Sequence, residues 1–186
     1  MTSKEINKDC TDRMEKALDV LREELKGLRT GRATPALLDS VRVDVHGSPT
    51  PIKHIANVTA PDPQSLMIKP FDPSLLKEID KAIRASDLGL APNSDGKAIR
   101  LSIPPMSGDQ RNKLTKRIKE LAEKAKVACR NIRRDANAAF DKAQKDGKMT
   151  EDERDKGKDE VQKTLKSYES KIDELADKKT KEVQES

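Results

Sequence analysis

The residues with the clearest chemical potential are cations gathered in one segment of the chain. Met106–Lys148 holds thirteen Lys or Arg residues against six Asp or Glu residues, whereas the remaining segments are nearly balanced or acidic. If Ile132 marks the centre of a buried helix face, a rotation of about 100° per residue places five cations on the opposite, outward face. They are Lys119, Lys126, Arg130, Arg133 and Arg134, with Arg111 nearer the edge of the buried face.

Such a stripe on a rigid helix suits the backbone of a nucleic acid. Guanidinium groups are planar, permanently charged forks that match pairs of phosphate oxygens. The same pattern is also typical of the solvated face of a helical bundle, so the stripe alone leaves both interpretations open. Because only 2% of the residues are aromatic, we expect no exposed rings that stack on unpaired bases, and a contact with phosphates in preference to base edges.

Groups that might catalyse a reaction or hold a cofactor are not arranged to do so. His46 and His54 stand in a proline-rich segment without a nearby cysteine and without the spacing of a helical metal pair. The sequence contains no glycine-rich phosphate loop and no nucleophile motif. Cys10 and Cys129 fall on predicted helix faces, which favours small buried side chains in a reducing compartment over a disulfide. We therefore expect no enzymatic activity, no metal and no cofactor.

Proline marks out the elements that must carry these residues. All ten prolines lie between Pro35 and Pro105, and a proline inside a helix costs about 3 kcal/mol or more. The flanking segments can therefore form long helices. We predict an α+β fold: an elongated three-helix bundle, discontinuous over residues 1–30 and 106–186, with a small β/α/β sandwich domain inserted at residues 31–105.

Three apolar seams predict the helices of the bundle. Thr2 and Glu5 form a capping box for the first helix, Gly31 ends it, and its seam is Met14, Leu18, Leu21, Leu25 and Leu28. The second helix opens with Ser107 and Gln110 and ends at Gly147, with a seam of Leu114, Ile118, Leu121, Ala125, Ala128, Ile132, Ala136, Ala139 and Ala143. Thr150 and Glu153 open the third, whose seam is Val161, Leu165, Tyr168, Ile172 and Leu175.

The inserted domain is expected to alternate strands with short helices. Thr34 and Pro35 begin a short helix through Asp39, and the apolar alternation of Val41–Val45 predicts a strand. The later elements are a turn-rich segment at His46–Pro51, a strand at Leu66–Lys69, a helix that opens at Pro73 and buries Leu75, Leu76, Ile79 and Ile83, and a closing strand at Ile99–Ile103.

The polarity of the chain indicates a soluble protein. Charged residues make up 38% of the sequence and the mean hydropathy is −0.85, but regular apolar spacing persists between the charges, which favours solvated helices over disorder. No run approaches 18 apolar residues, and the N-terminus lacks a signal or transit pattern. We expect a cytoplasmic monomer with no membrane partner.

Several segments in order resemble bacterial ribosome recycling factor along the whole chain. They are LRTGRATPALLD from Leu28, ASDLGLAPNSDG from Ala85, IRLSIPPM from Ile99, CRNIRRDAN from Cys129 and DEVQK from Asp159. The resemblance implies an L-shaped protein similar in outline to tRNA. Its bundle would bind large-subunit ribosomal RNA, and elongation factor G with GTP would then drive the subunits apart and release mRNA and tRNA.

The resemblance also implies roles for particular residues. In this family the arginines that correspond to Arg111, Arg130 and Arg133 contact ribosomal RNA, and we expect Lys119, Lys126 and Arg134 to add to that contact. Gln110 stands where some members carry a second basic residue, which leaves an extra contact there open. The family binds no nucleotide itself, because the GTP belongs to its partner.

The two crossings between the predicted domains form an expected hinge. Gly31, between Thr30 and Arg32, tolerates positive φ, whereas Pro104 and Pro105, before Met106, fix φ near about −65°. A pair of short connections should allow bending and restrict twisting.

An alternative function of a different class fits the same composition. A helical coiled-coil adaptor or chaperone would use a charged face to bind proteins. Steep weakening of ribosome binding in salt distinguishes a phosphate contact from a hydrophobic protein contact.

Overall fold

The computed structural model describes residues 2–185 and divides into two compact units. One unit comprises the chain up to Arg29 together with Gly108–Glu185, and the other is Thr30–Ser107. The first is helical and the second combines small antiparallel sheets with short helices. The expected α+β class, a helical bundle with an inserted β/α domain, is confirmed.

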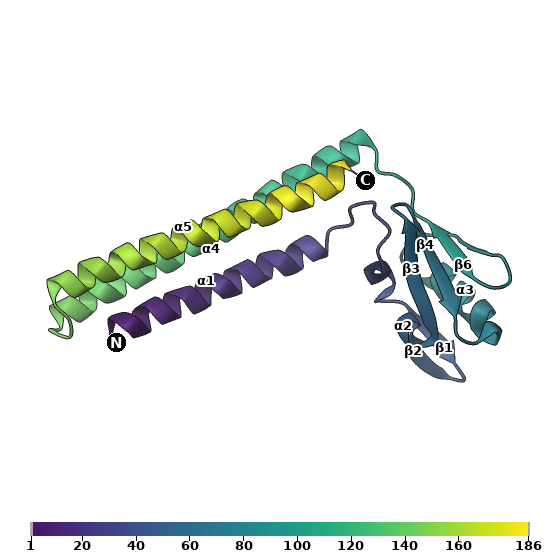
Figure 1. Ribbon diagram of the computed structural model, residues 1–186, viewed down its shortest axis with the longest axis horizontal. Helices are drawn as coiled ribbons and strands as arrows, with labels where there is room; N and C mark the ends of the chain where they lie inside the picture. The colour runs from purple at the N-terminus through teal and green to yellow at the C-terminus, as the bar shows by residue number, and fades with distance from the viewer. Residues whose placement is uncertain (1, 186) are drawn as a thin grey trace. The chain divides into compact units, whose positions relative to one another are not determined.

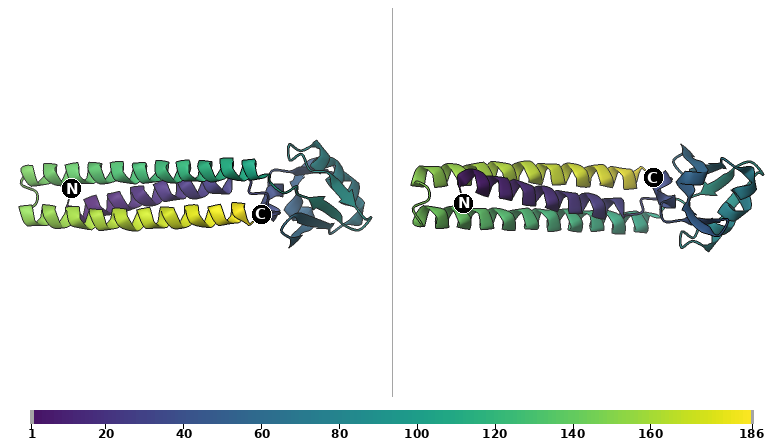
Figure 2. Two further views of the ribbon diagram at one scale, coloured as in Figure 1. Left: turned by 90° about the horizontal axis from the view of Figure 1, so that it is seen from above. Right: turned by 90° about the horizontal axis from the view of Figure 1, so that it is seen from below.

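Three long helices form the bundle: α1 (Ser3–Lys26), α4 (Gly108–Lys145) and α5 (Glu151–Gln184). α1 and α5 run in the same direction and α4 runs opposite to both (Figures 1 and 2). With 38 residues, α4 extends about 57 Å at a rise of about 1.5 Å per residue. In the described part of the chain, none of the helices is apolar over a stretch that would span a bilayer.

Capping boxes are present at the starts of α1 and α5. The Glu5 amide donates to Thr2 Oγ1 at 3.3 Å, and the Thr2 amide donates to Glu5 Oε2 at 2.7 Å. Thr150 and Glu153 make the same reciprocal pair at the start of α5. The backbone hydrogen bond from the cap residue lowers the pKa of each glutamate. These bonds satisfy amides that the first turn of a helix leaves without partners.

The first helix ends earlier than the sequence indicated. α1 stops at Lys26 with Gly27 as its C-cap, and Leu28 lies beyond the helix, partly buried. Gly31 does adopt positive φ, at 72°, but in the connection that follows. The Gly27 amide donates to the carbonyl of Glu23 at 3.1 Å and closes the last turn. The nearer glycine therefore ends the helix, and Gly31 serves a different turn.

The seams of α4 and α5 differ in detail from the predicted ones. On α4, Cys129 and Phe140 are buried where the alanines beside them, Ala128 and Ala139, were expected. On α5, Ala176 is buried and Leu175 only partly so. A helix that contacts two neighbours buries a face wider than one heptad seam, so a strict 3.5 period misplaces its edges. The two cysteines are buried as expected, and burial raises the pKa of the Cys129 thiol to about 11.

A glycine allows α5 to approach α4 closely near the turn that joins them. Gly157 is buried, and a Cβ atom built on it would lie 2.3 Å from Cε1 of Phe140. The Phe140 ring is fully buried, so the surrounding side chains restrict its movement away. Any larger residue at this position would require the ring or one of the two helices to shift.

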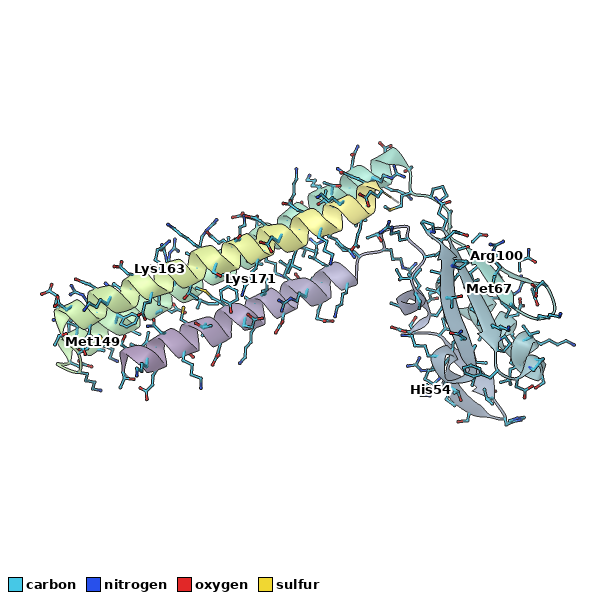
Figure 3. All side chains as sticks on the ribbon, viewed as in Figure 1. His54, Met67, Arg100, Met149, Lys163 and Lys171 are labelled. Carbon is cyan, nitrogen blue, oxygen red and sulfur yellow. The ribbon has the colours of Figure 1, made fainter. Side chains whose placement is uncertain are left out.

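The inserted unit contains two antiparallel sheets. A hairpin of β1 (Arg42–Val45) and β2 (Ser48–Pro51) forms one sheet. The other has the order β3-β4-β6-β5, from β3 (Ala56–Asp62), β4 (Ser65–Pro70), β6 (Ile99–Ser102) and β5 (Pro92–Ser94). In this sheet Met67 pairs with Thr59 on one side and Arg100 on the other, and both Met67 and Arg100 are labelled in Figure 3.

Short helices complete the core of this unit. They are the 3₁₀ helices η1 (Pro35–Leu38) and η2 (Pro73–Leu75), one turn of α2 (Ile52–Ile55), and α3 (Leu76–Ala85). Ile79 and Ile83 of α3 are fully buried in the same cluster as Ile68 and Ile99 of the central strands. The apolar alternation of Val41, Val43 and Val45 and of Ile99, Leu101 and Ile103 points inward to this cluster as expected. The strands are slightly shorter than predicted, because β1 begins after Val41 and β6 ends before Ile103.

Prolines concealed three strands from sequence analysis. The expected turn at His46–Pro51 is confined to His46 and Gly47, both at positive φ, and β2 follows although it contains Pro49 and Pro51. β3 and β5, which also contain proline, were not predicted. All three are edge strands, where a missing amide need not interrupt a ladder of hydrogen bonds. The short helix expected after Thr34 is present as a 3₁₀ helix, with Asp39 as its C-cap.

We predict that Gly157→Ala destabilises the protein by about 1–3 kcal/mol, the usual cost of forcing extra atoms into a packed core. The sign is informative, because alanine inside a helix is otherwise more favourable than glycine by about 1 kcal/mol. Urea unfolding followed by circular dichroism measures the change. Gly108→Ala is the control, since an added Cβ there meets no atom within 4 Å.

A second substitution tests the cause. Phe140→Leu replaces the ring that opposes Gly157 with a smaller side chain. The double variant should therefore lose less stability than the sum of the losses in the two single variants. Simple additivity of the two changes would show that the Phe140 contact is not the reason glycine is needed.

Candidate nucleic-acid interface

The cations of α4 divide into two groups according to what they contact. Lys126, Arg130 and Arg133 are half-buried along the side of α4 that faces α5. Lys119 and Arg134 are exposed, and neither has an ion-pair partner among residues 2–185. The prediction of one shared outward face is therefore wrong for the first group. A single helix wheel does not include the neighbouring helix, along whose side these long side chains lie.

Two carboxylates hold Arg130. Its Nη1 donates to Glu123 Oε1 at 3.0 Å and its Nε donates to Glu169 Oε1 at 3.1 Å. These hydrogen bonds, the one to Glu123 first, raise the pKa of the guanidinium, which stays charged at physiological pH. Glu123 comes from α4 and Glu169 from α5, so both helices fix the direction of the side chain.

Arg133 is oriented by a neutral partner instead. Its Nη1 donates to the amide oxygen of Gln162 at 3.0 Å. Its Nε is buried and has no hydrogen-bond partner within the described chain. An amide can position a guanidinium without cancelling its charge. Among the residues the structure describes, Arg133 has no carboxylate partner, so of the two oriented arginines it keeps the less compensated charge.

The remaining cations are held to different degrees. Lys126 forms an ion pair with Asp173 of α5 at 2.6 Å, and only 20% of its side chain is exposed. Arg111 is partly buried near the start of α4. On the opposite flank of α4, Arg13 of α1 donates to Asp135 at 2.8 Å. The basic charge therefore does not surround α4 evenly, and its oriented part follows the boundary with α5.

The structure identifies contributors that sequence analysis missed. Glu123, Gln162, Glu169 and Asp173 position the cations, although none was a candidate. In two antiparallel helices, residues at equal distances in sequence from the connecting turn lie at the same level. Pairing residues of α4 and α5 in this way about the turn at Gly147 would have placed polar residues of α5 beside the cations of α4. Gln162 lies within the DEVQK segment, whose role the sequence left unassigned.

One aromatic ring contradicts the expectation that none is exposed. Phe71, which follows β4, is 71% exposed, and its amide donates to the Ile55 carbonyl at 2.9 Å. It belongs to the inserted unit and not to the α4 interface. His46 and His54 are exposed in the same unit. No cluster of three or more metal-ligating side chains occurs among the described residues.

The residues of the predicted hinge are brought together in the inserted unit. A Cβ atom on Gly31 would lie 3.1 Å from Cγ of Met106, so the two connections lie side by side. Thr30 is buried and Arg32 half-buried, whereas Pro104 and Pro105 are exposed.

Comparisons with known proteins agree with the sequence resemblance. The family model described as ribosome recycling factor matches residues 21–183. A ribosome-recycling factor of Symbiobacterium thermophilum is 51% identical over 183 residues, which cover 98% of this chain and 99% of the relative. One of Shouchella clausii is 49% identical over 181 residues, 97% of this chain and 98% of the relative.

Solved structures give the same result. A solution structure of ribosome recycling factor superposes with a TM-score of 0.76 at 31% identity and covers 99% of this chain and 98% of that one. A second neighbour, with a TM-score of 0.65 and 43% identity over 98% of this chain and 99% of that one, is the Thermus thermophilus factor, placed with Escherichia coli elongation factor G on the post-termination complex.

We predict that Glu123→Gln strengthens binding of a short RNA duplex by about two- to fivefold, the range expected when an exposed competing charge is removed. Glu123 accepts a hydrogen bond from Nη1 of Arg130. A phosphate that binds this Nη1 must displace the glutamate. Fluorescence anisotropy at low salt measures the affinity. Glu174→Gln on α5, which makes the same change in net charge at an exposed site, is the control; an equal gain in both variants would rule out local competition.

Proposed function

The chain belongs to the ribosome recycling factor family, and from that membership we propose that it acts after translation termination. Together with elongation factor G it separates the ribosomal subunits and releases mRNA and tRNA. The observation that carries this function is the match of sequence and fold along nearly the whole chain to factors of that name. A related factor has been placed with elongation factor G on the post-termination complex.

The proposed division of chemistry assigns GTP hydrolysis to elongation factor G. This chain has no phosphate-binding loop in its sequence, and we propose that it is not an enzyme and needs no cofactor. Its contribution is to bind and transmit force. Bacterial ribosomes are in the cytoplasm, which is where such a factor works.

We further propose that Arg111, Arg130 and Arg133 anchor the bundle on large-subunit ribosomal RNA. The support is geometric for two of them: the contacts with Gln162 and Glu169 restrict the rotamers of Arg133 and Arg130 before RNA arrives. Less side-chain entropy is then lost on binding. Lys119, Lys126 and Arg134 add charge to the same region, and the exposed Lys119 and Arg134 do so without an intramolecular competitor.

A splitting assay tests the function as a whole. Light scattering of post-termination ribosomes should fall when the protein, elongation factor G and GTP are all present, and should stay constant when any one is omitted. Binding to large subunits, measured by co-sedimentation, should weaken steeply as salt is raised, because each phosphate contact releases counterions when it forms. A protein that leaves the ribosomes intact under these conditions would instead fit the adaptor or chaperone alternative.

We predict that Arg133→Ala weakens binding to large subunits by about 1–3 kcal/mol, the scale of a charge-assisted hydrogen bond. The slope of log affinity against log salt should become shallower by about 1. Arg13→Ala is a matched control, since Arg13 also pairs across a helix boundary but on the opposite flank of α4. Unchanged binding by the Arg133 variant, with helicity retained, would remove it from the interface.

The hinge proposal concerns the paired connections Thr30–Arg32 and Pro104–Met106. We propose that they let the inserted unit bend when elongation factor G pushes, while the bundle stays on RNA. Replacement of Pro104 and Pro105 by glycine should therefore lower the splitting rate more than the affinity for large subunits, because the RNA anchors are elsewhere. Stopped-flow scattering at saturating factor and equilibrium sedimentation give the two quantities, and equal losses in both would argue against a mechanical role.

A further inference from the structure

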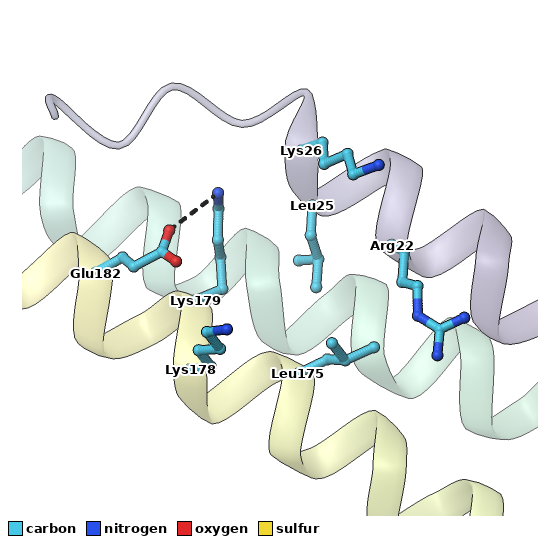
Figure 4. Close-up of a pocket in the computed structure, with 7 residues that line it drawn as sticks. All are labelled: Arg22, Leu25, Lys26, Leu175, Lys178, Lys179 and Glu182. Carbon is cyan, nitrogen blue, oxygen red and sulfur yellow. Dashed lines mark ion pairs between the residues drawn. The ribbon is translucent and has the colours of Figure 1, made fainter. Parts of the chain in front are cut away.

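A groove runs between the C-terminal parts of α1 and α5, away from the Arg130 and Arg133 contacts. Leu25 of α1 and Leu175 of α5 line it, and its volume is ≈ 270 Å³. Figure 4 shows the two leucines between the helices with charged side chains around them. Leu25 is buried, whereas Leu175 is only partly buried and can contact a ligand.

Cations surround this apolar surface. The lining residues besides the leucines are one carboxylate, Glu182, and four cations: Arg22, Lys26, Lys178 and Lys179. Arg22 is held by Asp19 at 2.6 Å and Glu15 at 3.2 Å. Lys179 is 3.3 Å from Glu182. Arg22 and Lys179 therefore both have carboxylate partners within the bundle.

The other two lysines are available to a ligand. Lys26 pairs with Glu23 at 3.0 Å, but both side chains are 73% exposed, and an ion pair so exposed contributes little and exchanges readily. Lys178 has no ion-pair partner among residues 2–185. Two ammonium groups therefore border an apolar surface without strong intramolecular competition.

Helix termini do not account for this arrangement. A cation in the last turn of a helix is stabilised by the helix dipole, which explains Lys26 at the end of α1. Lys178 and Lys179 precede the last turn of α5, which ends at Gln184. Lys179 is explained by its ion pair with Glu182 one turn along the same helix. Lys178 has no such partner among residues 2–185, so its position beside Leu175 has no explanation in helix stability alone.

We propose that this groove binds an acidic protein segment that inserts one apolar side chain between Leu25 and Leu175 and places carboxylates near Lys26 and Lys178. Pockets that enclose small-molecule ligands usually measure about 300–1,000 Å³, so this groove suits a side chain better than a cofactor. A nucleic-acid backbone would use the lysines but not the leucines. The charge around the groove and its apolar lining together favour the acidic peptide.

The proposal is independent of the RNA-anchor proposal, because the groove shares no residue with the contacts of Arg130 and Arg133. The test uses the full chain and two short blocked peptides, one with a single leucine flanked by glutamates and one with alanine in place of the leucine. Methyl NMR follows Leu25 and Leu175. The leucine peptide should shift both signals saturably and bind at least about fivefold more tightly than the alanine peptide.

Two variants locate the site. Lys178→Gln and Leu175→Ala should each weaken the leucine peptide about two- to fivefold. Lys163→Gln, at an exposed lysine of α5 outside the groove (Figure 3), should leave the affinity unchanged. Equal binding of the two peptides would overturn the proposal, as would equal weakening by Lys163→Gln. Shifts of these methyls caused by an RNA duplex but not by the leucine peptide would assign the groove to nucleic acid and equally reject the proposal.

Discussion

The packing of Phe140 against Gly157 is the contact on which the register of α4 and α5 depends. A ring on one helix and a missing side chain on the other can meet at one level only, and this level sets every later pairing along the antiparallel helices. Lys158 then meets Asp141, Gln162 meets Arg133, Glu169 meets Arg130 and Asp173 meets Lys126. A shift of α5 by one turn, about 5.4 Å, would separate each cation from its partner. An interior contact between two uncharged residues thereby determines the placement of surface charge.

This arrangement explains why a chain so poor in aromatic residues can still present a defined polar surface. Its bundle core is built from aliphatic side chains, alanines, two thiols and the rings of Phe140 and Tyr168. Around this core, the polar side chains form a layer of ion pairs and hydrogen bonds that link one helix to the next. Tyr168 belongs to both layers: its hydroxyl donates to Glu15 of α1 at 2.6 Å, and desolvation followed by this hydrogen bond raises the pKa of Tyr168 to about 12. The phenol thus remains a donor, and α1 and α5 stay linked, throughout the neutral range.

Local sequence signals predicted the elements well and the contacts between them poorly. The capping boxes at Thr2 and Thr150 and the alternating valines and isoleucines of the inserted unit depend on near neighbours in the chain, and all are confirmed. The orientation of Arg130 and Arg133 depends on α5, which a helix wheel of α4 does not represent. The edge strands with Pro49, Pro61 and Pro92 were missed because the effect of proline depends on whether a neighbouring strand needs its amide. Gly27 was overlooked for a related reason, since two glycines stood close enough to end the same helix.

The side-by-side placement of Gly31 and Met106 has a consequence for how the chain reaches its native state. During synthesis α1 leaves the ribosome first, and its apolar face has no partner until α4 and α5 follow more than eighty residues later. Closing so long a loop has an entropic cost that increases with loop length. The inserted unit lies wholly between these helices in sequence and has its own core, so it can fold as soon as it has emerged. Once folded, the inserted unit holds Gly31, which follows α1, beside Met106, which precedes α4. The search for contacts between the two helices is then as fast as across a short loop.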